Sequence, residues 1–169
     1  SYEVLHIDGP LAPHWISLME QSFENCSFAR VDADTLDKLI QKTDEIPSKL
    51  SKEDEEKLQP VFEKVLSKDK FKVQFESMSA DDAPIIITQP EFIRRMMEQQ
   101  KIGGAGFMGA FPEMYTVAIN GNHAKIGALL LKEEAAQVEF VKQLTDLALL
   151  SQGMLKGAAL NEFIERTTA

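Results

Sequence analysis

The chain has 169 residues, 44% of them hydrophobic, and a formal net charge of −9 at pH 7. This length and apolar fraction suffice for the core of one domain, or of one domain and part of a second. Binding to nucleic-acid phosphates needs a cationic surface, so the acidic balance argues against a nucleic-acid partner. No apolar run approaches the roughly 20 residues of a membrane-spanning helix, and the N-terminus lacks the layout of a signal peptide. We therefore expect a cytoplasmic protein that binds neither nucleic acid nor membrane.

The N-terminal residues predict a small unit of alternating strands and helices. In chain order these are a strand, a helix, a strand and a short helix, over residues 2–7, 12–24, 29–31 and 34–40. The strand-like start without a leader suggests a piece of a longer protein. Pro47 lies in a stretch with few apolar anchors, which is typical of a domain boundary. We expect one domain over residues 1–47 and a second over 48–169.

The middle of the chain predicts a capped helix followed by three strands. Ser51, with Asp54 three places on, is a helix N-terminal signature, and apolar residues follow at helical spacing up to Leu66. Alternating or β-branched apolar segments predict strands over residues 71–75, 84–88 and 114–119. Residues 124–131 then predict another helix. Together these elements indicate an α+β fold.

The C-terminal residues are purely helical. Residues 135–150 predict a helix whose apolar face is wider than one small domain would ordinarily bury. A last helix over 158–165 places Leu160, Phe163 and Ile164 on one side. Two such helices at the end of a chain suggest self-association through a helical bundle. Packing of both on their own domain is the alternative, and the pattern does not choose between them.

Three glycines, Gly104, Gly106 and Gly109, spell the G-x-G-x-x-G letters of a dinucleotide-binding loop. That loop needs a strand before it and a helix after it, so that the phosphates meet a helix N-terminus. Here a helix predicted over residues 90–101 precedes the glycines and a strand follows them. We therefore interpret the glycines as a source of flexibility and not as a phosphate site.

The helix over residues 90–101 carries one continuous apolar stripe. Its members are Phe92, Ile93, Met96 and Met97. Such a stripe is more often core than recognition surface, but methionine adapts to many partner shapes. The glycine-rich continuation adds Phe107 and Met108 on a segment that is costly to order. These residues favour a partner-binding role.

The sequence contains no evident enzyme active site. The three histidines, His6, His14 and His123, are scattered, without a second ligand at metal spacing. Cys26 could pair with a histidine as a nucleophile, but nothing local activates the thiol. As the only cysteine, it also excludes a disulfide within the chain and fits a reducing compartment. We expect neither a metal nor a cofactor in this chain.

Three segments are distinctive: ITQPEFIRRM at residues 87–96, NGNH at 120–123 and DLALLSQGMLKG at 146–157. They resemble the C-terminal third of the bacterial ninety-kilodalton heat-shock chaperones, the high-temperature protein G family. The resemblance spans nearly the whole chain and is looser near the N-terminus. It implies that residues 1–47 end a middle domain. Residues 48–169 would form a dimerisation domain whose last helices build an intermolecular four-helix bundle.

The resemblance also implies two sets of functional residues. Contacts with non-native client proteins would come from Trp15, His14, Leu18, Phe92, Ile93, Met96, Met97, Phe107 and Met108. The homodimer interface would come from Val141, Leu144, Ala148, Leu155, Leu160, Phe163 and Ile164. For Trp15, ordinary core packing is the alternative.

In the family, ATP and Mg²⁺ bind an N-terminal domain that this sequence does not contain, so the resemblance implies a chain without ATPase activity. Residues 165–169 do not resemble the acidic tail on which co-chaperones of eukaryotic relatives dock, and no such partner is expected. The leading hypothesis is therefore the dimerisation and client-binding module of an ATP-driven chaperone. The alternatives are a purely structural dimer with the Met-rich helix buried, and a small enzyme that uses Cys26 or the glycine loop.

Overall fold

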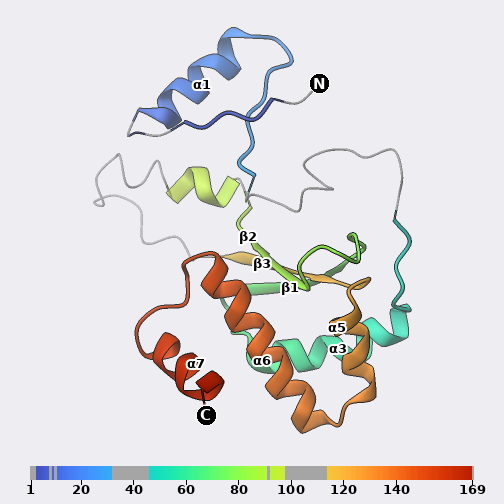
Figure 1. Ribbon diagram of the computed structural model, residues 1–169. Helices are drawn as coiled ribbons and strands as arrows, with labels where there is room; N and C mark the ends of the chain where they lie inside the picture. The colour runs from blue at the N-terminus through green and yellow to red at the C-terminus, as the bar shows by residue number, and fades with distance from the viewer. Residues whose placement is uncertain are drawn as a thin grey trace.

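A computed structural model describes residues 3–7, 9, 11–31, 46–90, 92–97 and 114–168 of the chain. Helices cover one face of a three-stranded sheet, and a separate helix, α1 (Ala12–Ser22), lies beyond the sheet on the other side (Figure 1). The predicted α+β class is confirmed.

The sheet has the strand order β1-β3-β2. Its strands are β1 (Phe71–Glu76), β2 (Ile85–Thr88) and β3 (Tyr115–Asn120). The central strand β3 runs parallel to β1 and antiparallel to β2. The last four residues of β3 are buried, as expected for a strand with a neighbour on each side. All three predicted strands are confirmed, with ends that differ by one residue.

The helix α3 (Lys52–Val65) begins where the sequence predicts. The Ser51 Oγ accepts a hydrogen bond from the Asp54 backbone N–H at 3.2 Å, and the hydroxyl donates to the Asp54 carboxylate at 2.7 Å. The first bond satisfies one of the free N–H groups at the start of the helix.

The single helix predicted over residues 124–131 is wrong in its second half. The structure has a short α5 (Ala124–Gly127) followed by the 3-10 helix η1 (Ala128–Leu131). Ile126 and Leu129 are both fully buried. Residues three apart share one side of an α-helix and of a 3-10 turn alike, so both side chains can enter the core across the junction of the two helices.

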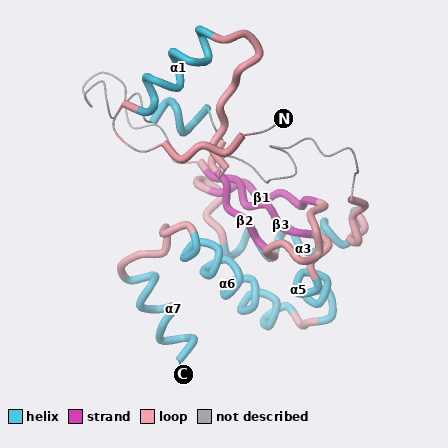
Figure 2. Tube along the Cα trace, turned by 45° about the horizontal axis from the view of Figure 1, so that its top comes forward, coloured by secondary structure: helices cyan, strands magenta, loops and turns pink. Residues whose placement is uncertain are grey.

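The helix α6 (Glu134–Ser151) packs with α3 against the same face of the sheet (Figure 2). The core lies between these layers and contains Leu58, Phe62, Ile85, Ile87, Val117, Ile119, Ile126, Leu129, Val141, Leu144 and Ala148. The chain then turns at Gly153 and Gly157, both with φ in the left-handed region that favours glycine. It continues into α7 (Ala158–Thr168), the last predicted helix, which contacts α6.

The N-terminal prediction is only partly confirmed. The helix α1 is present, but the described residues of the two predicted strands, 3–7 and 29–31, form no strand. A strand needs a neighbour to satisfy its backbone hydrogen bonds, and the short apolar alternation read from the sequence supplies no such neighbour. The helix predicted over 34–40 and the glycines at 104–109 lie outside the described residues. The domain boundary after residue 47 stays a prediction.

Candidate functional site

The helical residues 92–97 follow β2 almost directly. The Arg94 backbone N–H donates to the Pro90 carbonyl at 3.1 Å, which forms the first turn of this helix. Gln89 donates a side-chain hydrogen bond to the Met97 sulfur at 3.3 Å. Gln89, the residue directly after β2, therefore holds one side of the helix.

A cluster of hydrogen bonds, which we call the clamp, fixes the other side. Both guanidinium nitrogens of Arg95 donate to the carboxylate of Glu20 on α1, at 2.9 and 3.0 Å. One of them also donates to the Phe28 carbonyl at 2.9 Å. The Phe28 backbone N–H donates back to the Glu20 carboxylate at 2.8 Å. The clamp thus consists of Arg95, Glu20 and the backbone of Phe28, and it joins Arg95 to residues that lie 75 and 67 positions earlier in the sequence.

The electrostatics of the clamp favour its ionised form. The hydrogen bonds from Arg95, then the Phe28 backbone N–H, hold the pKa of Glu20 below its ordinary value, and the Arg95 charge adds to them. The two side chains remain 36% and 21% exposed for Arg95 and Glu20. Because water screens such a pair, the clamp is a modest and reversible attachment.

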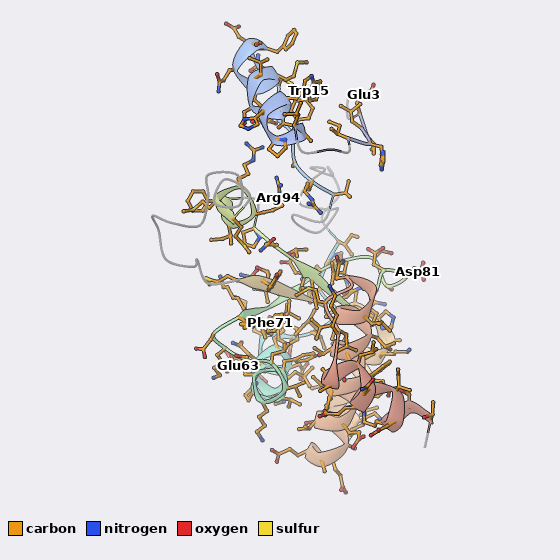
Figure 3. All side chains as sticks on the ribbon, turned by 90° about the vertical axis from the view of Figure 1, so that its left-hand side faces the viewer. Glu3, Trp15, Glu63, Phe71, Asp81 and Arg94 are labelled. Carbon is orange, nitrogen blue, oxygen red and sulfur yellow. The ribbon has the colours of Figure 1, made fainter. Side chains whose placement is uncertain are left out.

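An aromatic pair adjoins the clamp. The ring of Trp15 meets the ring of Phe28 edge to face, with centroids 5.7 Å apart. Trp15 is 41% exposed, and both His14 and Leu18 are exposed on the same helix. Trp15 is therefore only partly buried, and it is not one of the core residues of the described chain. Figure 3 shows Trp15 on α1 and Arg94 on the helix of residues 92–97.

The apolar stripe is divided between an exposed and a half-buried part. Phe92 is 70% exposed, whereas Ile93, Met96 and Met97 are half-buried. Phe107 and Met108 lie outside the described residues. Among the stripe residues, Phe92 offers the largest free apolar surface.

The C-terminal helices show that most residues assigned to the dimer interface are covered by their own chain. Val141, Leu144, Ala148, Leu155 and Phe163 are buried, Leu160 is half-buried and Ile164 is 48% exposed. The three α6 residues of that group belong to the core under the sheet.

The wide apolar face predicted for α6 includes residues that were not assigned to the dimer interface and that remain exposed. Leu147 and Leu150 are 45% and 40% exposed, and they lie three residues apart on the side that does not face the core. Phe140 lies seven residues before Leu147 and is half-buried.

The helix α7 is held on α6 by a polar and an apolar contact. Arg166 donates to the Asp146 carboxylate at 2.5 Å, and Phe163 is buried. The Arg166 guanidinium also lies 5.8 Å from the centroid of the Phe163 ring. Ile164 is left at the surface, on the same helix pair as Leu147.

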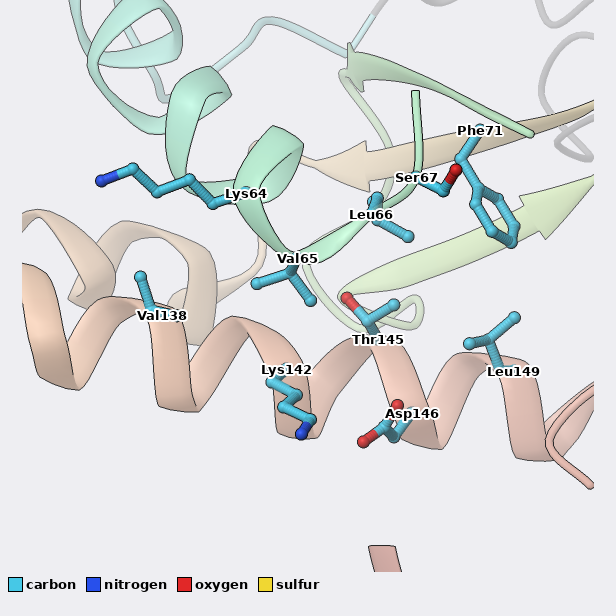
Figure 4. Close-up of a pocket in the computed structure, with 10 residues that line it drawn as sticks. All are labelled: Lys64, Val65, Leu66, Ser67, Phe71, Val138, Lys142, Thr145, Asp146 and Leu149. Atoms are coloured by element: carbon cyan, nitrogen blue, oxygen red, sulfur yellow. The ribbon is translucent and has the colours of Figure 1, made fainter. Parts of the chain in front are cut away.

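Two open cavities lie in the described part of the chain. One, of about 340 Å³, lies between the end of α3 and α6 and is lined by Val65, Ser67, Thr145 and neighbouring residues (Figure 4). The other, of about 440 Å³, includes His123, whose Nδ1 accepts a hydrogen bond from the Lys125 backbone N–H and so caps α5. Cys26 is half-buried and bonds none of the three histidines, all of which are described.

The described residues offer neither a cluster of metal ligands nor a membrane-spanning helix. They hold no group of three or more histidine, cysteine, aspartate or glutamate side chains suited to a metal ion. They also include no helix with the length and hydropathy needed to cross a membrane.

Comparison with known proteins identifies relatives of one kind. The chain is 32% identical to the chaperone protein HtpG of Porphyromonas gingivalis and 31% identical to that of Bacteroides thetaiotaomicron, in each case over 98% of the chain. A Bacteroides fragilis HtpG is 28% identical over the same share. The chain spans 34% of the length of these relatives. The aligned stretch of 235 residues exceeds the 169 of the chain, so the relatives carry additional residues within it. No family model matches the chain.

Proposed function

Because the chain is homologous to about a third of the HtpG chaperones, we propose that it is a client-binding and dimerisation module of such a chaperone. One observation carries the client-binding part of the proposal. Phe92 is 70% exposed on a helix that is held on both sides, by Gln89 and by the clamp. A large aromatic ring held at the surface by polar anchors is a contact that is ready for an apolar partner.

The chemistry of the site suits non-native proteins. Unfolded chains expose apolar side chains, and burial of a Phe ring against them contributes about 1.5–3 kcal/mol. Trp15 and Leu18 offer further exposed apolar surface on α1. Met96 and Met97 lie beside Phe92 and can adapt to clients of different shape. The net charge of −9 helps to keep a protein with such a surface in solution.

Replacement of the exposed ring tests this site. We expect Phe92→Ser to weaken binding of reduced, carboxymethylated α-lactalbumin, a protein that cannot refold, by about tenfold in fluorescence anisotropy, because one buried ring is lost. Leu131→Ser is the matched control, since Leu131 is 90% exposed on η1 and lies outside the proposed site. An equal loss in both variants would mean that binding is nonspecific and would contradict the proposal.

We propose that a second copy of the chain covers the exposed apolar side chains of α6 and α7, which gives an intermolecular four-helix bundle. Leu147, Leu150 and Ile164 support this part, because they leave apolar surface on two adjacent helices. Within the interface first predicted from the sequence, Leu160 and Ile164 are the residues that are not already buried. The buried residues of that predicted set would contribute indirectly, by holding α6 and α7 in place within their own chain.

ATP binding and hydrolysis would then belong to the part of the HtpG relatives outside the matched third. The 169-residue chain should show no ATP turnover above that of buffer in a phosphate-release assay, and measurable turnover would contradict this assignment. The cytoplasm is the proposed location. The exposure of Phe92 favours client binding over the purely structural dimer, in which the whole stripe would be buried.

A further inference from the structure

The segment 11–31 is attached to the rest of the described chain without core packing. The helix α1 buries none of its 11 residues, and no residue of the segment belongs to the hydrophobic core. The clamp, in which Arg95 meets Glu20 and Phe28, joins it to the sheet side of the molecule. Polar contacts therefore contribute much of what holds this segment in place.

The geometry of the clamp requires an arginine. Two guanidinium nitrogens of Arg95 each donate an N–H to one oxygen of the Glu20 carboxylate. The Nη2 of these two nitrogens also donates to the Phe28 carbonyl. A lysine has the charge but not the planar fork, so it would keep only part of this arrangement. The Phe28 backbone N–H completes the cluster by donating to Glu20.

The clamp connects the two halves of the proposed client site. Arg95 lies on the helix that presents Phe92, and Phe28 supplies the ring that meets Trp15. A change in the clamp therefore reaches both exposed aromatic residues. Because the pair is partly exposed, its strength is limited and falls with added salt.

We propose that Arg95 and Glu20 are positioning residues that hold the Phe92 helix and the Trp15 helix in one arrangement, so that both rings meet the same client. This inference rests on the proposed client-binding function. Held in advance, the two surfaces lose less conformational freedom on binding, which raises the affinity. Release of the clamp separates the two surfaces and lowers the affinity for the client.

The first measurement follows the clamp without a client. In Arg95→Ala we expect hydrogen exchange at the amides of residues 92–97 and Phe28 to become about fivefold faster, because the ion pair and its backbone bonds are lost. The emission of Trp15, the only tryptophan, should shift as its contact with Phe28 loosens. In Arg95→Lys, the exchange rate of these amides should fall between the rates of the parent chain and of Arg95→Ala. Lys68→Ala, which breaks the Glu63 ion pair on α3, is the control and should leave these amides unchanged.

The second measurement uses the same variants with reduced, carboxymethylated α-lactalbumin. We expect Arg95→Ala and Glu20→Gln each to weaken binding by about fivefold, with partial recovery in Arg95→Lys. Unchanged exchange in Arg95→Ala would overturn the clamp as an anchor. Weaker binding in Phe92→Ser but not in Arg95→Ala would overturn the positioning role and leave the proposed function intact. No loss in Phe92→Ser would overturn both.

Discussion

The side chain of Asn122 accepts a hydrogen bond from the backbone N–H of Lys49, at 2.6 Å, across 73 positions of sequence. The same amide donates to the Met78 carbonyl at 2.9 Å, and the Asn122 backbone N–H donates to the Asn120 side chain at 3.0 Å. The turn after β3 thus joins the residues that lead into α3 to the loop that follows β1. Both asparagines are buried, and their amide groups satisfy backbone groups that the sheet does not.

The first prediction concerns this turn. Asn122→Ala should lower the free energy of unfolding by about 1–3 kcal/mol, because it leaves the Met78 carbonyl without its partner in the interior. Urea denaturation monitored by circular dichroism measures the change. Asn161→Ala removes an exposed asparagine from α7 and should have an effect near zero. An Asn122→Ala variant as stable as the parent would show that water replaces the amide without cost.

A second prediction concerns Thr145, the buried residue on α6 whose hydroxyl has no hydrogen-bond partner among the described residues. The residue lines the cavity between α3 and α6, among the apolar side chains of Val65, Val138 and Leu149 (Figure 4). Thr145→Val keeps the shape and replaces the unpaired hydroxyl by a methyl group. We expect it to raise the free energy of unfolding by about 1 kcal/mol.

Thr145→Ser is the matched control for that substitution. It keeps the hydroxyl and removes the methyl group, so it should lower the free energy of unfolding by about 1 kcal/mol through lost packing. The opposite signs separate the polar from the apolar contribution in the same urea experiment. A loss of stability in Thr145→Val would mean that the hydroxyl is bonded in solution.

The third prediction concerns pH. The pKa of Glu20 is lowered in the folded protein, chiefly by its hydrogen bonds with Arg95, so the clamp binds fewer protons than the unfolded chain. Its stabilising contribution is complete above the ordinary glutamate pKa of about 4.3 and is lost as the pH falls from there through the lowered folded value. We therefore expect the Trp15 emission to shift as the pH is lowered below about 4.3.

The variant Arg95→Ala controls for general acid unfolding. Three other carboxyl groups also have lowered pKa values: Asp54 through Ser51, Glu63 through Lys68 and Glu134 through Lys64. Their protonation on acidification destabilises the fold as well. In Arg95→Ala the shifted emission should already be present at neutral pH, and further change should occur only with global unfolding. Coincident transitions in the two proteins would contradict a separate titration of the clamp.

The elements with strong local signals could be predicted from the sequence. The Ser51 cap, the β-branched run of β2 and the long helix α6 each depend on patterns within one segment, and all three are confirmed. The predicted strands at 2–7 and 29–31 failed because short apolar alternation does not specify a pairing partner. The 3-10 turn after α5 depends on how Ile126 and Leu129 meet the core, which is a property of the whole fold.

The candidate site was only partly predictable for a related reason. The stripe from Phe92 to Met97 is visible as helical spacing, but which of its members is exposed depends on what packs beside the helix. The clamp has no local signal, because an arginine and a glutamate 75 positions apart are two of many charged residues. Likewise, the apolar face of α6 predicted an interface, but the residues first assigned to it turned toward the core.

The last prediction concerns self-association through the outer face of α6 and α7. Leu147→Glu combined with Ile164→Glu places two like charges on apolar surface that a second copy would bury, at a cost of several kcal/mol. We expect the parent chain to have the mass of a dimer in light scattering and the double variant that of a monomer with an unchanged circular dichroism spectrum. Leu131→Glu is the control, because Leu131 is the more exposed residue, yet lies on η1 away from the proposed interface. A double variant that remains dimeric would contradict this interface. Loss of the dimer in Leu131→Glu would show that the interface includes η1 instead. Loss of the helical spectrum in the double variant would show that Leu147 and Ile164 stabilise the single chain, in contradiction to their proposed role at the surface.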